Sequence, residues 1–171
     1  MPTSRPLQLV LLTHPTEFYK ASNTGALLAP ALSAFGEHQV QRLSWSRVAP
    51  EPALQHQQGY ALLYPAAQAT VLDCDEPALL RLPETIHSVI LLDATWQLAQ
   101  KMYNQSPYLQ QMPALMLHSR QSSAYLLRRN QRQAGWCTAE CAAMLLQKTG
   151  AAAAASAIQQ AFAVFNQRQT S

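Results

Sequence analysis

The sequence predicts one α/β domain in which a mostly parallel β-sheet is flanked by helices. Three apolar runs carry this prediction, at residues 7–12, 60–64 and 88–92. Each is too short for a stable helix and ends at a proline-bearing turn or a polar residue, as buried strands do. The third run leads directly into a segment with helical spacing, the alternation that is typical of parallel sheets. At 171 residues, the chain has the size of a single domain with a substantial core.

The composition excludes several classes of protein. Hydrophobic residues make up 49% of the chain and charged residues 12%, which is typical of a globular protein. No apolar run approaches the roughly 20 residues that span a membrane, and the first residues lack the pattern of a signal peptide, so we expect a cytoplasmic protein with no membrane contact. The cysteines are odd in number and form no CxxC pair, which argues against a disulfide framework and a zinc site: Cys74, Cys137 and Cys141.

Charge is distributed unevenly along the chain. Residues 1–85 carry a net charge of −2, whereas residues 86–171 carry +5. Between Asp93 and Glu140 there is no carboxylate, but there are Lys101, Arg120, Arg128, Arg129 and Arg132. Such a segment suits a polyanion such as RNA, because guanidinium groups bind phosphates in a planar fork. A solvated basic surface is the simpler alternative.

In chain order, the first strand is expected over residues 7–12, followed by a crisp turn at His14-Pro15. Thr16 then can cap a short helix with Glu17 in its first turn, and a second helix is expected over residues 26–32. Before that helix, Asn23 and Thr24 are either helix caps or a polar ligand loop. Residues 39–45 predict a second strand, and residues 46–59 a loop or a poorly ordered helix.

The next elements are a strand over residues 60–64, a short segment at 69–72 with an acidic loop after it, and the strand that ends at Asp93. Ligands bind at the carboxyl ends of strands in open α/β sheets, so Asp93 lies at a functional corner. Its carboxylate has two possible roles, capping the following helix or catalysis. In that helix, Trp96 lies on the face expected to enter the core.

The last third of the chain is expected to contain a loop between Pro107 and Pro113, a strand over residues 114–117, and the basic cluster on a short helix or loop. Thr138 can cap a helix over residues 139–148, which Gly150 ends. A terminal helix over residues 151–168 carries an apolar stripe: Ile158, Phe162 and Phe165.

Common catalytic motifs are absent: the sequence contains no GxGxxG after a strand, no P-loop, no GxSxG and no HExxH. Five other short motifs occur in order: His14-Pro15-x-Glu17 with Asn23-Thr24-Gly25, Leu63-Tyr64-Pro65, Asp93-Ala94-Thr95-Trp96, Ser123-x-Tyr125-x-x-Arg128, and Thr138-x-Glu140. Together they resemble the DTW-domain family over residues 8–147. We therefore treat residues 1–171 as a single DTW domain.

This resemblance implies a tRNA-uridine aminocarboxypropyltransferase, which transfers the 3-amino-3-carboxypropyl group of S-adenosylmethionine to a ring nitrogen of uridine in tRNA. It also implies a fold related to the SPOUT class, with a knotted cofactor site. Many family members begin with a cysteine-rich segment that binds zinc. No cysteine precedes Cys74 here, so we expect no such segment and no metal.

By the same resemblance, Asp93, Thr95 and Trp96 are the candidate catalytic residues. Asp93 is either the base for the weakly acidic uridine N–H or a ligand of the donor's amino group. The expected donor-binding residues are Asn23, Thr24, Tyr64, Pro65 and Asp93. The residues expected to bind uridine or RNA are His14, Glu17, Ser123, Tyr125, Arg128, Arg129, Arg132, Thr138 and Glu140.

Two other functions remain open, a SPOUT-type RNA methyltransferase and a non-catalytic RNA-binding module. The first differs in which carbon of the sulfonium faces the acceptor. The second predicts RNA binding that depends on salt, without affinity for S-adenosylmethionine. A monomer is the expected oligomeric state.

Overall fold

The computed structural model describes residues 6–36, 38–55, 58–120 and 136–168. These residues form one six-stranded sheet in the order β2-β1-β5-β3-β6-β4, and every neighbouring pair is parallel. The predicted α/β class and parallel sheet are therefore confirmed. The strands are β1 (Gln8–Thr13), β2 (Gln39–Ser44), β3 (Tyr60–Leu63), β4 (Thr70–Asp73), β5 (Ser88–Asp93) and β6 (Ala114–His118).

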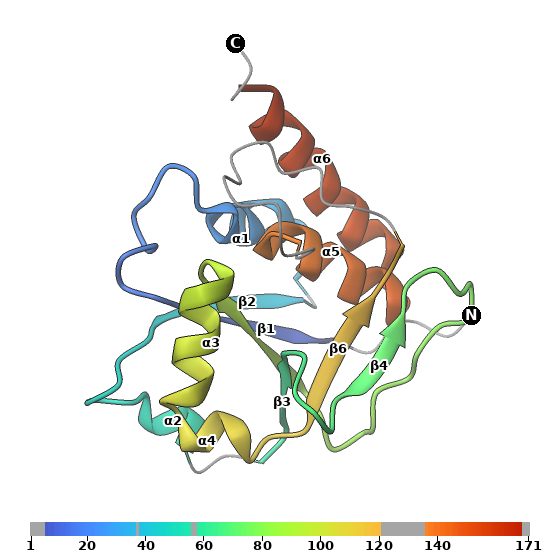
Figure 1. The fold of residues 1–171 in the computed structure, drawn as a ribbon. Coiled ribbons are helices and arrows are strands. Elements are labelled where there is room, and N and C mark those ends of the chain that lie inside the picture. Colours follow the sequence, from blue (N-terminus) through green and yellow to red (C-terminus); the bar gives the residue numbers. More distant parts are fainter. Residues whose placement is uncertain (1–5, 37, 56–57, 121–135, 169–171) are drawn as a thin grey trace.

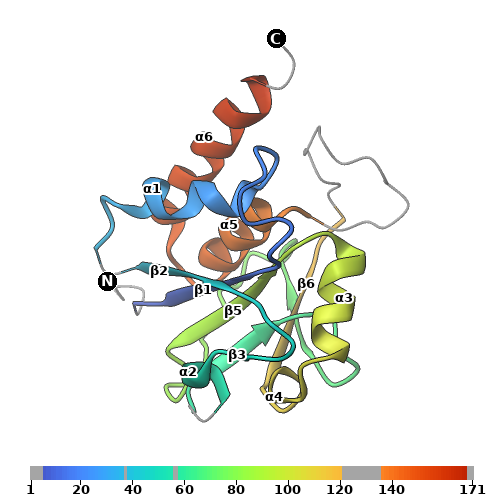
Figure 2. The same ribbon diagram turned by 90° about the vertical axis from the view of Figure 1, so that its left-hand side faces the viewer.

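Helices cover both faces of the sheet (Figures 1 and 2). The helices α1, α5 and α6 pack on one face, and α2, α3 and α4 lie on the other. The helices are a 3₁₀ turn η1 (Thr24–Leu27), α1 (Leu28–Leu32), α2 (Pro52–Gln55), α3 (Trp96–Asn104), α4 (Pro107–Gln110), α5 (Thr138–Lys148) and α6 (Ala152–Arg168). None of the described helices combines the length and apolar character needed to cross a bilayer.

The central strands are buried on both sides, as continuous apolar runs require. In β1, Leu9 and Leu11 face α5 and α6, whereas Val10 and Leu12 face the opposite helices. Side chains alternate in the same way along β5, where Val89 lies in the first cluster and Ile90 in the second. The two apolar clusters hold the sheet between its helices. This packing fixes the positions of the carboxyl ends of the strands.

Two local predictions were wrong. The expected loop at residues 107–113 contains a one-turn helix, α4, which begins at Pro107. Residues 46–59, expected to be a loop or a poorly ordered helix, contain the one-turn helix α2, which begins at Pro52. Proline favours the first helical turn, where its missing N–H costs nothing, so these prolines start helices. In contrast, no helix forms after Thr16; residues 15–19 are turns in which Thr16 bonds the ring of His14.

Candidate functional site

The candidate site lies at the carboxyl ends of two adjacent inner strands, β1 and β5. These strands pair in register, so Thr13 and Asp93 are neighbours at the last position of each. The main chain continues this pairing, because the His14 N–H donates to the Asp93 carbonyl at 3.2 Å. Asp93 is therefore fixed at the corner that the sequence predicts, and its side chain points to the face covered by α1 and α5.

The carboxylate of Asp93 is 2% exposed and accepts three side-chain hydrogen bonds. Its Oδ2 accepts from the Thr13 hydroxyl at 2.9 Å and from the Asn23 amide at 3.0 Å. Its Oδ1 accepts from the Thr138 hydroxyl at 2.8 Å. The donors come from β1, from the loop before η1 and from α5, so one side chain joins three segments that are distant in the sequence.

Two capping predictions were wrong, for a common reason. Asp93 does not cap α3; the cap is Thr95, whose hydroxyl accepts from the Leu98 N–H at 3.3 Å. Thr138 does not cap α5, because its hydroxyl is bonded to Asp93. Cys137 is the N-cap, and the Glu140 carboxylate accepts from its N–H at 3.1 Å. The actual caps, Thr95 and Cys137, have the extended backbone of an N-cap, which local spacing does not reveal.

Asn23 and Thr24 serve the structure as well as the site. The Asn23 side chain caps η1, since its oxygen accepts from the Ala26 N–H at 2.9 Å while its amide donates to Asp93. The Thr24 hydroxyl accepts from the Ala139 N–H at 3.2 Å, in the first turn of α5. Both predicted donor-binding residues are buried and hydrogen-bonded within the protein.

Sequence reasoning missed Arg42, a charged residue in β2 on the same face as Asp93. Its Nη2 lies 4.0 Å from Asp93 Oδ2 and donates to the Phe18 carbonyl at 2.6 Å. The guanidinium carbon also lies 3.9 Å from the centre of the Phe18 ring. The signal that could have identified Arg42 is its charge, because it lies in β2, which pairs with the buried strand β1.

A column of aromatic rings lies on the opposite face of the sheet, next to the same edge. Tyr64 follows β3 and stacks on Tyr103 at 4.2 Å and on Trp96 at 5.8 Å between ring centres. Trp96 is partly buried and packs against the cluster that contains Tyr64, as expected for a core-facing residue. Burial raises the pKa of Tyr64 above its ordinary value. Pro65, the next residue, is exposed.

His14 and Glu17 lie in the turn after β1. The His14 ring stacks on Trp45 at 5.5 Å, and its Nδ1 accepts from the Thr16 N–H at 3.2 Å. Burial lowers the pKa of His14, and Lys101 and Lys20 lower it further against the opposing effect of Glu17. The Glu17 carboxylate is paired with Lys20 at 2.7 Å. His14 thus lies at the rim of the site as a weakly basic imidazole.

Five of the predicted RNA-binding residues lie outside the described part of the chain: Ser123, Tyr125, Arg128, Arg129 and Arg132. Of the remaining predicted residues, Asn23, Asp93 and Thr138 are in direct contact, whereas Tyr64, Trp96 and Glu17 are separate from that cluster. In the described ranges, no group of three or more His, Cys, Asp or Glu side chains could hold a metal ion.

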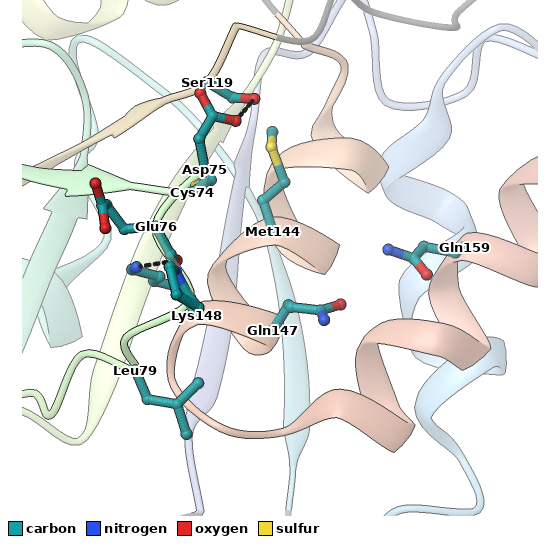
Figure 3. A pocket seen from close by; sticks show the side chains of 10 residues that line it. Cys74, Asp75, Glu76, Leu79, Ser119, Met144, Gln147, Lys148 and Gln159 are labelled. Atoms are coloured by element: carbon teal, nitrogen blue, oxygen red, sulfur yellow. Dashed lines mark hydrogen bonds between the residues drawn. The ribbon is translucent and has the colours of Figure 1, made fainter.

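A pocket of about 420 Å³ opens at the carboxyl ends of β4 and β6, away from Asp93 (Figure 3). Asp75 in its wall accepts from the Ser119 hydroxyl and the Arg120 N–H, both at 2.8 Å, and these bonds lower the pKa of Asp75. The buried Lys148 ammonium donates to the Glu76 carbonyl at 2.9 Å. None of the ten residues that line this pocket belongs to the predicted site.

Comparison with known families gives the decisive observation, a match between residues 1–170 and the model of the DTW domain. The chain belongs to the DTW-domain family. A curated relative of this DTW-domain protein is tRNA-uridine aminocarboxypropyltransferase 2 from the mouse, Mus musculus, which is 29% identical over 148 residues. The alignment covers 83% of the chain but 49% of the mouse protein, so the chain spans about half the length of this relative. No solved structure matches the chain.

Proposed function

We propose that this DTW-domain protein transfers the 3-amino-3-carboxypropyl group of S-adenosylmethionine to N3 of a uridine in tRNA. The observation that carries the proposal is membership of the DTW family over residues 1–170, together with a mouse relative named for this transfer. Contacts between residues of the family motifs support it: Asn23 and Thr138, which lie 70 and 45 positions from Asp93 in the sequence, both donate hydrogen bonds to the Asp93 carboxylate at one strand end. We also propose that the parallel sheet is a variant of the SPOUT fold and that the enzyme works in the cytoplasm.

In the proposed reaction, uridine N3 attacks the γ-carbon of the donor's methionine side chain. The N3–C bond forms as the C–S bond breaks, and the bonding electron pair passes to sulfur. The sulfonium thereby leaves as neutral methylthioadenosine and needs no acid, while the N3 proton is released. What the protein must supply is orientation, since the γ-carbon and not the methyl group has to face the acceptor.

The aromatic column is our proposed wall of the donor pocket. Tyr64 and Trp96 present stacked rings beside the strand edge, and aromatic faces attract cations such as a sulfonium. Pro65 and Thr95, the residues next to Tyr64 and Trp96 in the sequence, are exposed. We propose that His14 donates to the uracil from its Nε2, since its Nδ1 is already an acceptor for the Thr16 N–H. Arg128, Arg129 and Arg132 are the proposed ligands of tRNA phosphates or of the donor carboxylate.

The test is a transfer assay on unmodified tRNA with S-adenosylmethionine labelled either in its carboxyl carbon or in its methyl group. We expect carboxyl label in the RNA and methyl label in released methylthioadenosine. Methyl label in the RNA would instead identify an RNA methyltransferase. If neither label enters an RNA that binds tightly, the result points to a non-catalytic RNA-binding module or to an RNA that is not the substrate.

A further inference from the structure

The Asp93 carboxylate is enclosed by protein groups on every side that the structure describes. Two donors saturate Oδ2 and a third bonds Oδ1, so at most one of about four lone-pair sites remains. Gly25 lies directly on the carboxylate, and a Cβ added there would be 2.5 Å from Oδ2. With 2% of the residue exposed, no uracil ring can approach this side chain without displacing one of its partners.

We infer that Asp93 is a positioning residue, whose carboxylate fastens the loop before η1 and the first turn of α5 to the ends of β1 and β5. This inference rests on the proposed function. It differs from the role of Asp93 as the base that takes the N3 proton of uridine. The carboxylate takes no proton from uridine; the N3 proton passes to water as the N3–C bond forms. Asp93 acts on the reaction through the loop and the helix that it holds.

The chemistry of the cluster explains why a carboxylate occupies this position. All three partners donate, and an ionised carboxylate is the side chain that only accepts. An amide at position 93 would turn an NH₂ group toward either the Asn23 amide or the Thr138 hydroxyl. The negative charge is balanced by Arg42, whose Nη2 lies 4.0 Å from Oδ2. This makes the buried charge tolerable, because an unpaired one would be strongly destabilising.

The geometry offers a reciprocal exchange as the test. Asp93→Asn alone either opposes its NH₂ group to that of Asn23 or forces the Thr138 hydroxyl to accept, and in both cases it removes the charge that faces Arg42. Asn23→Asp alone opposes two carboxylates across the present 3.0 Å bond. In the double variant, the amide at position 93 donates to the new carboxylate at position 23 and to the Thr13 hydroxyl. Its oxygen still accepts from Thr138. Every hydrogen bond is restored, but no carboxylate remains at position 93.

If Asp93 positions the site, the double variant recovers transfer to within about tenfold of the parent chain, whereas each single variant is much slower. If Asp93 is the base, the double variant stays as slow as Asp93→Asn, roughly 10²- to 10⁴-fold down, although it folds. That second outcome would overturn the inference.

Thermal unfolding tests the inference without the reaction, so its failure is distinguishable from failure of the proposed function. We expect each single variant to unfold about 3–10 °C below the parent and the double variant to regain most of that loss. Thr138→Val removes one donor with little change in shape, and Thr138→Ser restores the hydroxyl. The valine variant should lower both Tm and kcat, and serine should rescue both. A valine variant that keeps the full rate of transfer would overturn the positioning role.

Discussion

At the scale of single residues, the candidate site depends on the absence of a side chain at Gly25. A Cβ there would meet all three terminal atoms of Asp93 within 2.5–2.9 Å. We predict that Gly25→Ala lowers the free energy of unfolding by about 1–3 kcal/mol, because either the carboxylate or η1 must move. Urea denaturation measures this, and transfer activity should fall with it.

Gly36→Ala is the matched control for this substitution. Nothing lies within 4 Å of a Cβ at that position, and its φ is not positive. Its free energy of unfolding should stay within about 0.5 kcal/mol of the parent value. Equal effects at Gly25 and Gly36 would show that the contact with Asp93 does not constrain residue 25.

Cys137 gives the protein a dependence of stability on alkaline pH. Burial is the main cause that raises the pKa of Cys137 to about 12, against an ordinary value of 9.0. Below pH 9 the thiol is protonated in the folded and the unfolded chain, so its ionisation costs no stability. Between pH 9 and about 12 only the unfolded chain ionises, and the free energy of unfolding falls by up to about 1.4 kcal/mol per pH unit.

The comparison that isolates this effect is Cys137→Ser. A serine hydroxyl does not ionise in this range and still caps a helix. Urea titrations at several pH values should show a shallower decline for the serine variant than for the parent. Parallel declines would mean that the thiol of Cys137 ionises equally in both states.

At the scale of elements, α3 begins with a cap that also belongs to the candidate catalytic motif. Thr95 is exposed, and its hydroxyl accepts from the Leu98 N–H. We predict that Thr95→Ala destabilises the protein by about 1 kcal/mol, as loss of a cap does, and that Thr95→Ser restores stability. If serine restores stability but not transfer, Thr95 has a role toward substrate beyond capping.

The elements themselves were largely predictable, and the errors have physical causes. Apolar runs located β1, β3, β5 and β6 within about one residue, since strands buried on both faces cannot be polar. Short helices were missed where proline looks like a loop signal, as at Pro107. Caps were misassigned because a threonine before a helix can bond to any nearby acceptor, and Thr138 bonds to a carboxylate 45 positions away.

At the scale of the whole molecule, charge asymmetry predicts how the protein should bind RNA. Residues 86–171 carry a net charge of +5, with Arg128, Arg129 and Arg132 close together in the sequence. We predict that the affinity for tRNA falls steeply between about 50 and 200 mM salt, a range over which the Debye length roughly halves. Replacing the three arginines by alanine should lower the slope of log Kd against log salt by about 2–3.

Arg81→Ala is the control for this experiment. Arg81 is highly exposed, but it lies in the segment before β5 and is 3.7 Å from Glu84. Its removal subtracts one positive charge, a third of what the triple variant loses, without touching the basic cluster, so the salt slope should not change. If Arg81→Ala instead lowers the slope by about a third as much as the triple variant does, binding depends on net charge alone.

Several residues of the candidate site could be predicted from the sequence, but the contacts between them could not. The family resemblance selected Asn23, Asp93 and Thr138 as candidates with separate roles, and the structure brings their side chains into contact. That Thr13 would complete the set, that Arg42 would balance its charge, and that Gly25 would cover it depend on the register of β1, β2 and β5. Register between distant strands follows from the packing of the entire sheet, which one sequence does not display.

The bonds to Asp93 also determine when the site can exist during synthesis of the chain. They join Asp93 to residues 80 and 70 positions earlier and 45 positions later. β1 can pair with β2 early in synthesis, but it can pair with β5 only after residues 88–93 have been made. The last donor, Thr138, becomes available only when the start of α5 has been made. Contacts of such long range form slowly. The candidate site is therefore among the last parts to assemble, and a chain released before residue 138 cannot contain it.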